Sequence, residues 1–219
     1  MPPRKVVQDD GLLLPSPELR AAVEVVCDRD RTFRPIEANF GPLRVRQWTP
    51  GFASLVRIIM GQQLSTKAAQ AIFTRLTQYL KLTPANLAAA PETILKQAGL
   101  SRTKIATCQR LSQALLTDQV NLAGLSLLPD ETAIEHLTQI KGIRVWTAEV
   151  YLLFWLQRLS VLPASDLAIQ VGFQELKHLK TRPTRQILLV LTDPLHPYRG
   201  AVAHLLWHYY RHRHRSNRP

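Results

Sequence analysis

The feature that most limits how this chain can fold is the stretch 137–166, LTQIKGIRVWTAEVYLLFWLQRLSVLPASD. It reads as the end of one helix, a tight turn at 141–144, a strongly apolar helix, and a lone carboxylate, Asp166, beyond a proline. A short turn between two helices points backbone N–H groups outward at a helix N-terminus, and that arrangement suits a phosphate. The stretch therefore predicts a device that holds a nucleic-acid backbone and presents a carboxylate to it.

The charge balance points to a polyanionic partner. The 219-residue chain has 28 Lys and Arg against 16 Asp and Glu, a formal net charge of +12. Nucleic acid is the first partner that this excess suggests, and an anionic membrane surface is the second. A ribosome-associated or merely soluble basic protein would have the same balance. The N-terminus lacks an apolar signal core, and the longest apolar run, 145–156, is too short to span a bilayer, so we expect a soluble intracellular protein.

Residues that often bind cofactors are sparse. Cys27 and Cys108 are isolated, which argues against a disulfide framework, a zinc knuckle and an iron–sulfur cluster. His204, His208 and His212 follow one another at intervals of four, so they share one helix face with a spacing that can build a metal site. Their surroundings are rich in arginine, and phosphate contact or plain surface is the alternative interpretation.

Nearly every periodic segment of the chain has the helical period, so we predict an all-α fold. Ser16 and Ser65 should cap helices, and Gly61 should end the helix that begins at Phe52. The segment 29–50 shows no clear periodicity and is expected to be irregular. The expected organisation is a flexible arm, one helical domain that contains the hairpin, and a basic tail: 1–15, 16–210 (hairpin 130–158) and 211–219.

Several segments resemble the helix–hairpin–helix DNA glycosylases, and within them the bacterial 3-methyladenine DNA glycosylase II (AlkA-like) family. The resemblance covers roughly residues 16–210 and is carried, in the family's order, by GQQLSTKAAQAI (61–72), GLSRTKIATCQRLSQAL (99–115), GIRVWTAE (142–149), LPASD (162–166) and PYRGAVAHLLW (197–207). It implies a two-lobed fold with the active-site cleft between the lobes. The β-rich N-terminal domain of some relatives is expected to be absent, because few residues precede the first helix.

By this resemblance Asp166 is the expected catalytic residue. Cleavage of an N-glycosidic bond develops positive charge on the sugar, and a nearby carboxylate stabilises that charge and can orient a water molecule. The alternative interpretation is that Asp166, or its neighbour Ser165, merely caps a helix after Pro163.

The expected base pocket contains Trp146, Trp207, Val150 and Tyr151. Trp146 stands where lyase-capable relatives have a Schiff-base lysine, which favours a monofunctional glycosylase; a buried core tryptophan is the alternative. Electron-rich rings attract cations by roughly 0.5–2 kcal/mol, which favours cationic N-alkylated purines as substrates. Glu149 is a weaker acid–base candidate, because a solvated helix charge is the more common state.

The resemblance also assigns the remaining contacts with DNA. Gln63 matches the residue that fills the gap left by a flipped base, with Leu64 as its alternative, while Gln62 would face the DNA or brace the loop. Backbone contacts are expected from the hairpin and from scattered polar residues: Lys141, Gly142, Ile143, Arg144, Thr147, Ser65, Lys67 and Arg199.

The hairpin departs from the family pattern at one position. The family usually has glycine where this chain has Arg144, and if that position needs a positive φ the arginine costs on the order of 1 kcal/mol. Relatives bind a monovalent cation at this turn through backbone carbonyls, which implies K⁺ or Na⁺ near Ile140 and Ile143. No other cofactor is implied.

We therefore expect a monomeric, monofunctional DNA-3-methyladenine glycosylase that acts on duplex DNA with alkylated bases in the bacterial cytoplasm, at the nucleoid. Two alternatives remain open. One is a non-catalytic protein that binds damaged DNA. The other is a glycosylase of the same fold that removes oxidised or mismatched bases.

Overall fold

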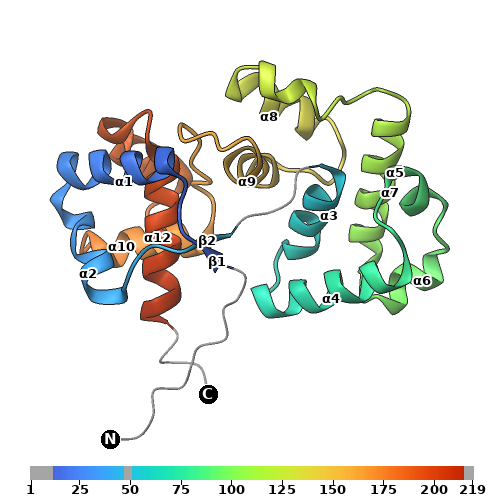
Figure 1. The fold of residues 1–219 in the computed structure, drawn as a ribbon, viewed down its shortest axis with the longest axis horizontal. Coiled ribbons are helices and arrows are strands. Elements are labelled where there is room, and N and C mark those ends of the chain that lie inside the picture. The colour runs from blue at the N-terminus through green and yellow to red at the C-terminus, as the bar shows by residue number, and fades with distance from the viewer. Residues whose placement is uncertain (1–11, 47–50, 215–219) are drawn as a thin grey trace, which may run out of the picture. The chain divides into compact units, whose positions relative to one another are not determined.

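The computed structural model describes residues 12–46 and 51–214 and is almost entirely helical, as the periodicity predicts (Figure 1). The chain divides into two compact units. Unit 1 combines Met1–Gln47 with Ala164–Pro219, and unit 2 is the continuous segment Trp48–Pro163. The active-site cleft expected between two lobes stays a prediction.

Unit 1 is built around its last helix. Its elements are α1 (Pro17–Arg29), η1 (Arg31–Phe33), α2 (Pro35–Phe40), α10 (Leu167–Leu176), α11 (Arg185–Leu191), η3 (Asp193–Leu195) and α12 (Arg199–Arg213). The apolar stretch Gly200–Leu206 is buried, and α12 packs against α1, α2 and α10 (Figure 1). A Cβ atom on Gly172 of α10 would lie 3.2 Å from the carbonyl oxygen of Leu206, so glycine lets the α10 and α12 backbones approach closely.

Unit 2 contains the predicted hairpin. Its elements are α3 (Phe52–Gly61), α4 (Thr66–Tyr79), α5 (Pro84–Ala89), α6 (Glu92–Gln97), α7 (Arg102–Leu116), η2 (Gly124–Leu127), α8 (Asp130–Thr138) and α9 (Val145–Trp155). The strongly apolar α9 packs against α3 and α8, and α7 packs against α3 and α5 (Figure 1). Because α9 is surrounded, seven of its residues are buried, as a helix without a polar face requires.

The N-cap predictions hold because short polar side chains can satisfy the first backbone N–H groups of a helix. The hydroxyl of Ser16 accepts from Leu19 N, and that of Ser65 accepts from Ala68 N, each at 3.3 Å. Gly61 is the last residue of α3 rather than a residue beyond its end.

The segment 29–50 contains more structure than its sequence suggests. It includes η1, α2 and the two-residue strand β2 (Val45–Arg46), which pairs antiparallel with β1 (Leu12–Leu13). Elements of this length carry too few residues to show a period. At the other end α12 continues to Arg213, beyond residue 210, where we placed the start of the basic tail. Most of the predicted arm (residues 1–11) and the end of the tail (215–219) lie outside the described residues.

Within the part of the chain that the structure describes, no helix is long and apolar enough to cross a membrane. The described residues also contain no group of three His, Cys, Asp or Glu side chains that could hold a metal ion. The metal interpretation of the three histidines on α12 is therefore not supported.

Two of those histidines belong to the core of unit 1. His204 and His208 are buried, and Nε2 of His208 lies 3.1 Å from the carbonyl oxygen of Gly41. Burial, with a smaller contribution from Arg211, lowers the pKa of His204 to about 4. Burial and the neighbouring His212 lower the pKa of His208 to about 4.

We expect the stability of unit 1 to fall between pH 6.5 and pH 4. In the unfolded chain a histidine protonates near pH 6.5, whereas His204 and His208 stay neutral in the folded state down to about pH 4. The unfolded state therefore binds more protons in this window, and stability is lost as the pH falls. Urea midpoints measured from pH 7.5 to 4.5 should decrease, and His208→Gln should flatten this decrease. His196→Gln, at an exposed position, should leave the pH dependence unchanged; equal slopes for all three proteins would contradict the prediction.

Candidate active site

Asp166 lies at the start of α10 and caps it. Its Oδ1 accepts hydrogen bonds from the backbone N–H groups of Ala168 at 2.9 Å and Ile169 at 3.1 Å. The Gln170 side-chain amide donates to the carbonyl oxygen of Ala164 at 2.8 Å and closes the turn that leads into the helix. The carboxylate is half-buried, so the capping interpretation holds, and a partly accessible carboxylate remains at this helix N-terminus.

Trp207, from the middle of α12, meets this carboxylate. Its indole Nε1–H donates to Oδ1 of Asp166 at 3.1 Å, although the two residues are 41 positions apart in the chain. The ring of His204, one turn earlier on α12, lies edge-on to the indole with centroids 6.0 Å apart. The sequence analysis places Asp166 and Trp207 in the expected site, but it did not predict their hydrogen bond.

The hairpin of unit 2 has the tight turn that the sequence predicts. Gly142 has φ +107°, and the N–H of Ile143 donates to the carbonyl oxygen of Ile140 at 2.9 Å. Ile143 is buried, whereas Lys141 and Arg144 are exposed. Arg144 is the N-cap of α9 with φ −102°, an ordinary extended conformation, so the strain considered for this arginine does not occur.

Gln62 braces the loop that follows α3. Its side-chain amide donates to Oγ1 of Thr147 at 2.9 Å and lies 3.3 Å from the carbonyl oxygen of Gly142. Of the two roles considered for Gln62, the structure therefore shows the bracing one. Lys104 supports the same loop, because its ammonium donates to the carbonyl oxygen of Met60 near the end of α3 at 2.6 Å.

Gln63 and Leu64 form the exposed tip of this loop. Gln63 has φ +58°, the left-handed conformation that costs a residue with a side chain about 1–2 kcal/mol. Both side chains are exposed, and Ser65 then caps α4. Sequence reasoning missed this backbone conformation, since glutamine carries no signal for a positive φ.

We expect Gln62→Leu to destabilise unit 2 by about 1–3 kcal/mol, because the buried hydroxyl of Thr147 loses its donor. Urea unfolding would measure the loss. Gln63→Leu is the matched control. Its side chain is exposed, so the free energy of unfolding should stay within about 0.5 kcal/mol of the wild-type value. Equal destabilisation by both changes would contradict the bracing role.

The other expected pocket residues on α9 differ in exposure. Trp146 is half-buried, while Val150 and Tyr151 are buried in unit 2. The Tyr151 ring stacks on Trp155 with centroids 5.2 Å apart. Glu149 is only 3 % exposed, so the expectation of a solvated helix charge is wrong. The helical periodicity of the sequence did not identify the buried face of α9, because this helix has apolar residues on almost every side.

Thr147 and the remaining predicted DNA contacts are placed as follows. Thr147 is buried against Gln62, so its side chain does not reach the surface. Ser65 and Lys67 are exposed at the start of α4. Arg199 is largely buried: its guanidinium donates to the carbonyl oxygens of Leu189 and Thr192 and to Asp193.

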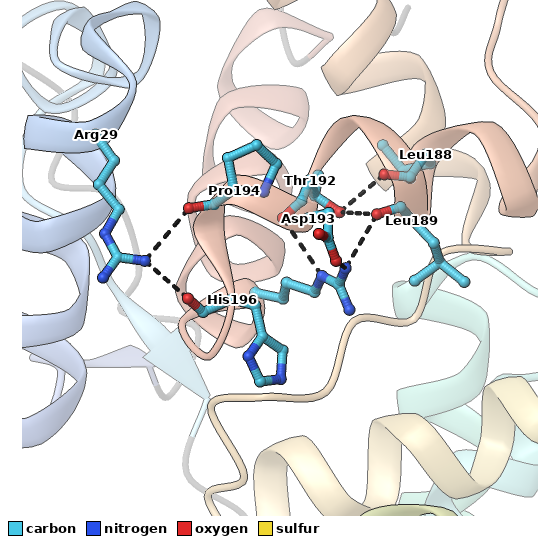
Figure 2. Close-up of polar contacts among 8 residues, drawn as sticks. Arg29, Leu188, Leu189, Thr192, Asp193, Pro194 and His196 are labelled. Atoms are coloured by element: carbon cyan, nitrogen blue, oxygen red, sulfur yellow. Dashed lines mark hydrogen bonds and ion pairs between the residues drawn. The ribbon is translucent and has the colours of Figure 1, made fainter.

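Arg199 thereby supports the loop between α11 and α12. From the other side of that loop, the guanidinium of Arg29 donates to the carbonyl oxygens of Pro194 at 3.3 Å and His196 at 2.7 Å (Figure 2). The two arginines thus satisfy carbonyl oxygens at the end of α11 and in the loop that follows it. These hydrogen bonds give Arg199 a structural role. Its contact with DNA stays a prediction.

Taken together, the fold and these residues define a helix–hairpin–helix protein in which an aspartate that caps α10 follows the second hairpin helix in the chain. Residues 56–194 match the HhH-GPD superfamily of base excision DNA repair proteins, and the chain belongs to this family. The resemblance inferred from the sequence is confirmed.

Particular members of the family are similar over most of the chain. DNA-3-methyladenine glycosylase 1 of Schizosaccharomyces pombe is 34 % identical over 174 residues, which cover 77 % of this chain and 76 % of that protein. The solved structure of the 3-methyladenine DNA glycosylase of S. pombe, in complex with abasic DNA, has a TM-score of 0.78 at 31 % identity and covers 85 % of this chain and 95 % of its own. A DNA-3-methyladenine glycosidase from Bacillus halodurans has a TM-score of 0.70 at 31 % identity, with coverages of 85 % and 87 %.

Proposed function

We propose that this chain is a DNA-3-methyladenine glycosylase of base excision repair, which removes alkylated bases such as 3-methyladenine and 7-methylguanine from duplex DNA. The similarity to a yeast and a bacterial protein named for this activity supports the substrate class. The observation that carries the proposal within the chain is the half-buried carboxylate of Asp166, held by two backbone N–H groups and by Trp207.

The chemistry proposed for Asp166 is electrostatic. The bond between C1′ of the sugar and the base nitrogen breaks, and its electron pair leaves with the base. An alkylated purine carries a positive charge before this step, so it leaves as a neutral base and needs little protonation. The carboxylate stabilises the positive charge that develops on the sugar. A water oxygen then bonds to C1′, and the released proton passes to Asp166 and on to solvent.

The other residues are proposed to hold the DNA around this step. The exposed Gln63, with Leu64 beside it, fills the gap left by the flipped base. The hairpin, with the exposed Lys141 and Arg144, binds the DNA backbone. The carbonyl oxygens of Ile140 and Ile143 would hold K⁺ or Na⁺, which would supply positive charge toward a DNA phosphate. The ring of Trp207, beside Asp166, attracts the cationic base, and Trp146 stays an expected residue of the base pocket. Arg144 has an ordinary backbone conformation, so this departure from the family pattern gives no reason to prefer a non-catalytic DNA binder.

The protein should release bases without cutting the strand. A glycosylase that also cleaves DNA needs an amine to form a Schiff base with the sugar, and Trp146 cannot supply one. A duplex with a single 7-methylguanine, incubated with the protein, should yield free base and an abasic strand that breaks only after hot alkali. Cleavage before alkali would contradict the monofunctional assignment. Binding to the duplex without any base release would support the damage binder instead.

A further inference from the structure

We propose that Trp207 is a positioning residue for Asp166, and that its indole N–H orients the carboxylate for the reaction. This inference rests on the proposed glycosylase function. It assigns the tryptophan a role that depends on its N–H group, beyond the role of an aromatic ring in the base pocket.

Three donors converge on one oxygen of the carboxylate. The N–H groups of Ala168 and Ile169 and the indole N–H of Trp207 all bond Oδ1, at 2.9, 3.1 and 3.1 Å. Two of these donors belong to the backbone of α10 and the third to a side chain of α12. The carboxylate that would stabilise the sugar cation is therefore oriented through Oδ1, by groups of two helices.

The third donor, the indole N–H of Trp207, comes from α12 and can therefore restrict the carboxylate in a way that the α10 backbone does not. The two backbone donors both belong to the first turn of α10, so they hold Oδ1 but leave the terminal torsion of the aspartate, which is intrinsically broad, less restricted. The indole approaches from α12 and adds a contact from outside α10. A donor bonded to a carboxylate also makes a stronger hydrogen bond than a neutral pair would.

The indole itself is held in place. The edge-on ring of His204 contacts it, and the neighbours Leu206 and His208 on α12 are buried. The close approach of α10 and α12, where Gly172 meets the backbone of Leu206, holds the two helices against each other next to Trp207. A ring needed only for stacking could be phenylalanine, whereas a positioning role requires the N–H group.

The contact can be tested without any activity. In the ¹H–¹⁵N spectrum, the indole resonance of Trp207 is assigned by its loss in Trp207→Phe. In Asp166→Asn it should move upfield and exchange faster with solvent, and in Asp166→Ala it should move further, because the charged acceptor is first neutralised and then removed. The indole resonance of Trp155 serves as the internal control. A Trp207 resonance that is unchanged in both variants would overturn the proposal.

The role is tested by removing the N–H while keeping the ring. Replacement of Trp207 by 3-benzothienylalanine, in which sulfur takes the place of N–H, should slow single-turnover base release from 7-methylguanine DNA by roughly ten- to a hundredfold. Affinity for the same DNA and the thermal midpoint should stay near the wild-type values. Trp207→Phe should slow the reaction at least as much.

The outcomes separate this inference from the proposed function. A wild-type rate with benzothienylalanine and a low rate with phenylalanine would show that only the ring matters, and would overturn the positioning role. If the wild-type protein released no base, the proposed function would fail, and the response of the indole resonance to Asp166→Asn would still decide whether Trp207 positions the carboxylate.

Discussion

Asp166→Asn is expected to reduce base release from 7-methylguanine DNA at least about a hundredfold while leaving DNA binding intact. The asparagine side-chain oxygen can still accept from Ala168 N and Ile169 N, so the start of α10 should be preserved. What the substitution removes is the negative charge that would stabilise the sugar cation. Single-turnover base release and equilibrium binding to the same duplex measure the two effects separately.

The control for this variant must change the net charge equally. Asp28→Asn does so at an exposed position in the same unit, where the carboxylate pairs with the exposed Arg34. It should lower neither base release nor binding. A similar loss of activity in both variants would indicate a general effect of charge on DNA binding, and full activity of Asp166→Asn would remove Asp166 from the mechanism.

The second large effect is expected at the hairpin, where Gly142→Ala should destabilise unit 2 by about 2–5 kcal/mol. A Cβ atom at this position would lie 2.1 Å from Oγ1 of Thr107 on α7, and φ is +107°. The alanine therefore meets both a strained backbone and a collision with a buried helix. Urea unfolding measures the loss, and affinity for undamaged duplex DNA should fall with it, because the turn can no longer keep its shape.

A second glycine provides the matched control. Gly61 lies in the last turn of α3, and a Cβ atom there would meet nothing within 4 Å. Gly61→Ala should therefore be neutral or stabilise the protein by up to about 1 kcal/mol, through its better helix propensity. If the two alanine variants had the same stability, the close packing of the hairpin on α7 could not be what shapes the turn.

Local signals in the sequence were sufficient for much of the fold and for the candidate site. Helix starts at Ser16 and Ser65 were predictable because capping depends on neighbouring residues alone. The hairpin turn at Gly142 and the capping position of Asp166 were predictable for the same reason.

The features that sequence reasoning missed depend on distant residues or on weak local preferences. The bond between Trp207 and Asp166 joins two helices, and the bond between Gln62 and Thr147 spans 85 positions. The short helix α2 is too brief for periodicity to identify. Glu149 was misjudged because α9 is enclosed by neighbours that only the tertiary structure supplies.

The order in which the two units occur along the chain affects how the protein can form during synthesis. Unit 2 is one uninterrupted segment, so all of its residues are synthesised before the second part of unit 1. Unit 1 forms later, because α1 and α2 pack on α12, which follows unit 2 in the chain. Until α12 has been synthesised, it cannot bury the apolar faces of α1 and α2, which include Val23, Val26 and Ile36. Apolar surface exposed in this way during synthesis promotes association with other chains.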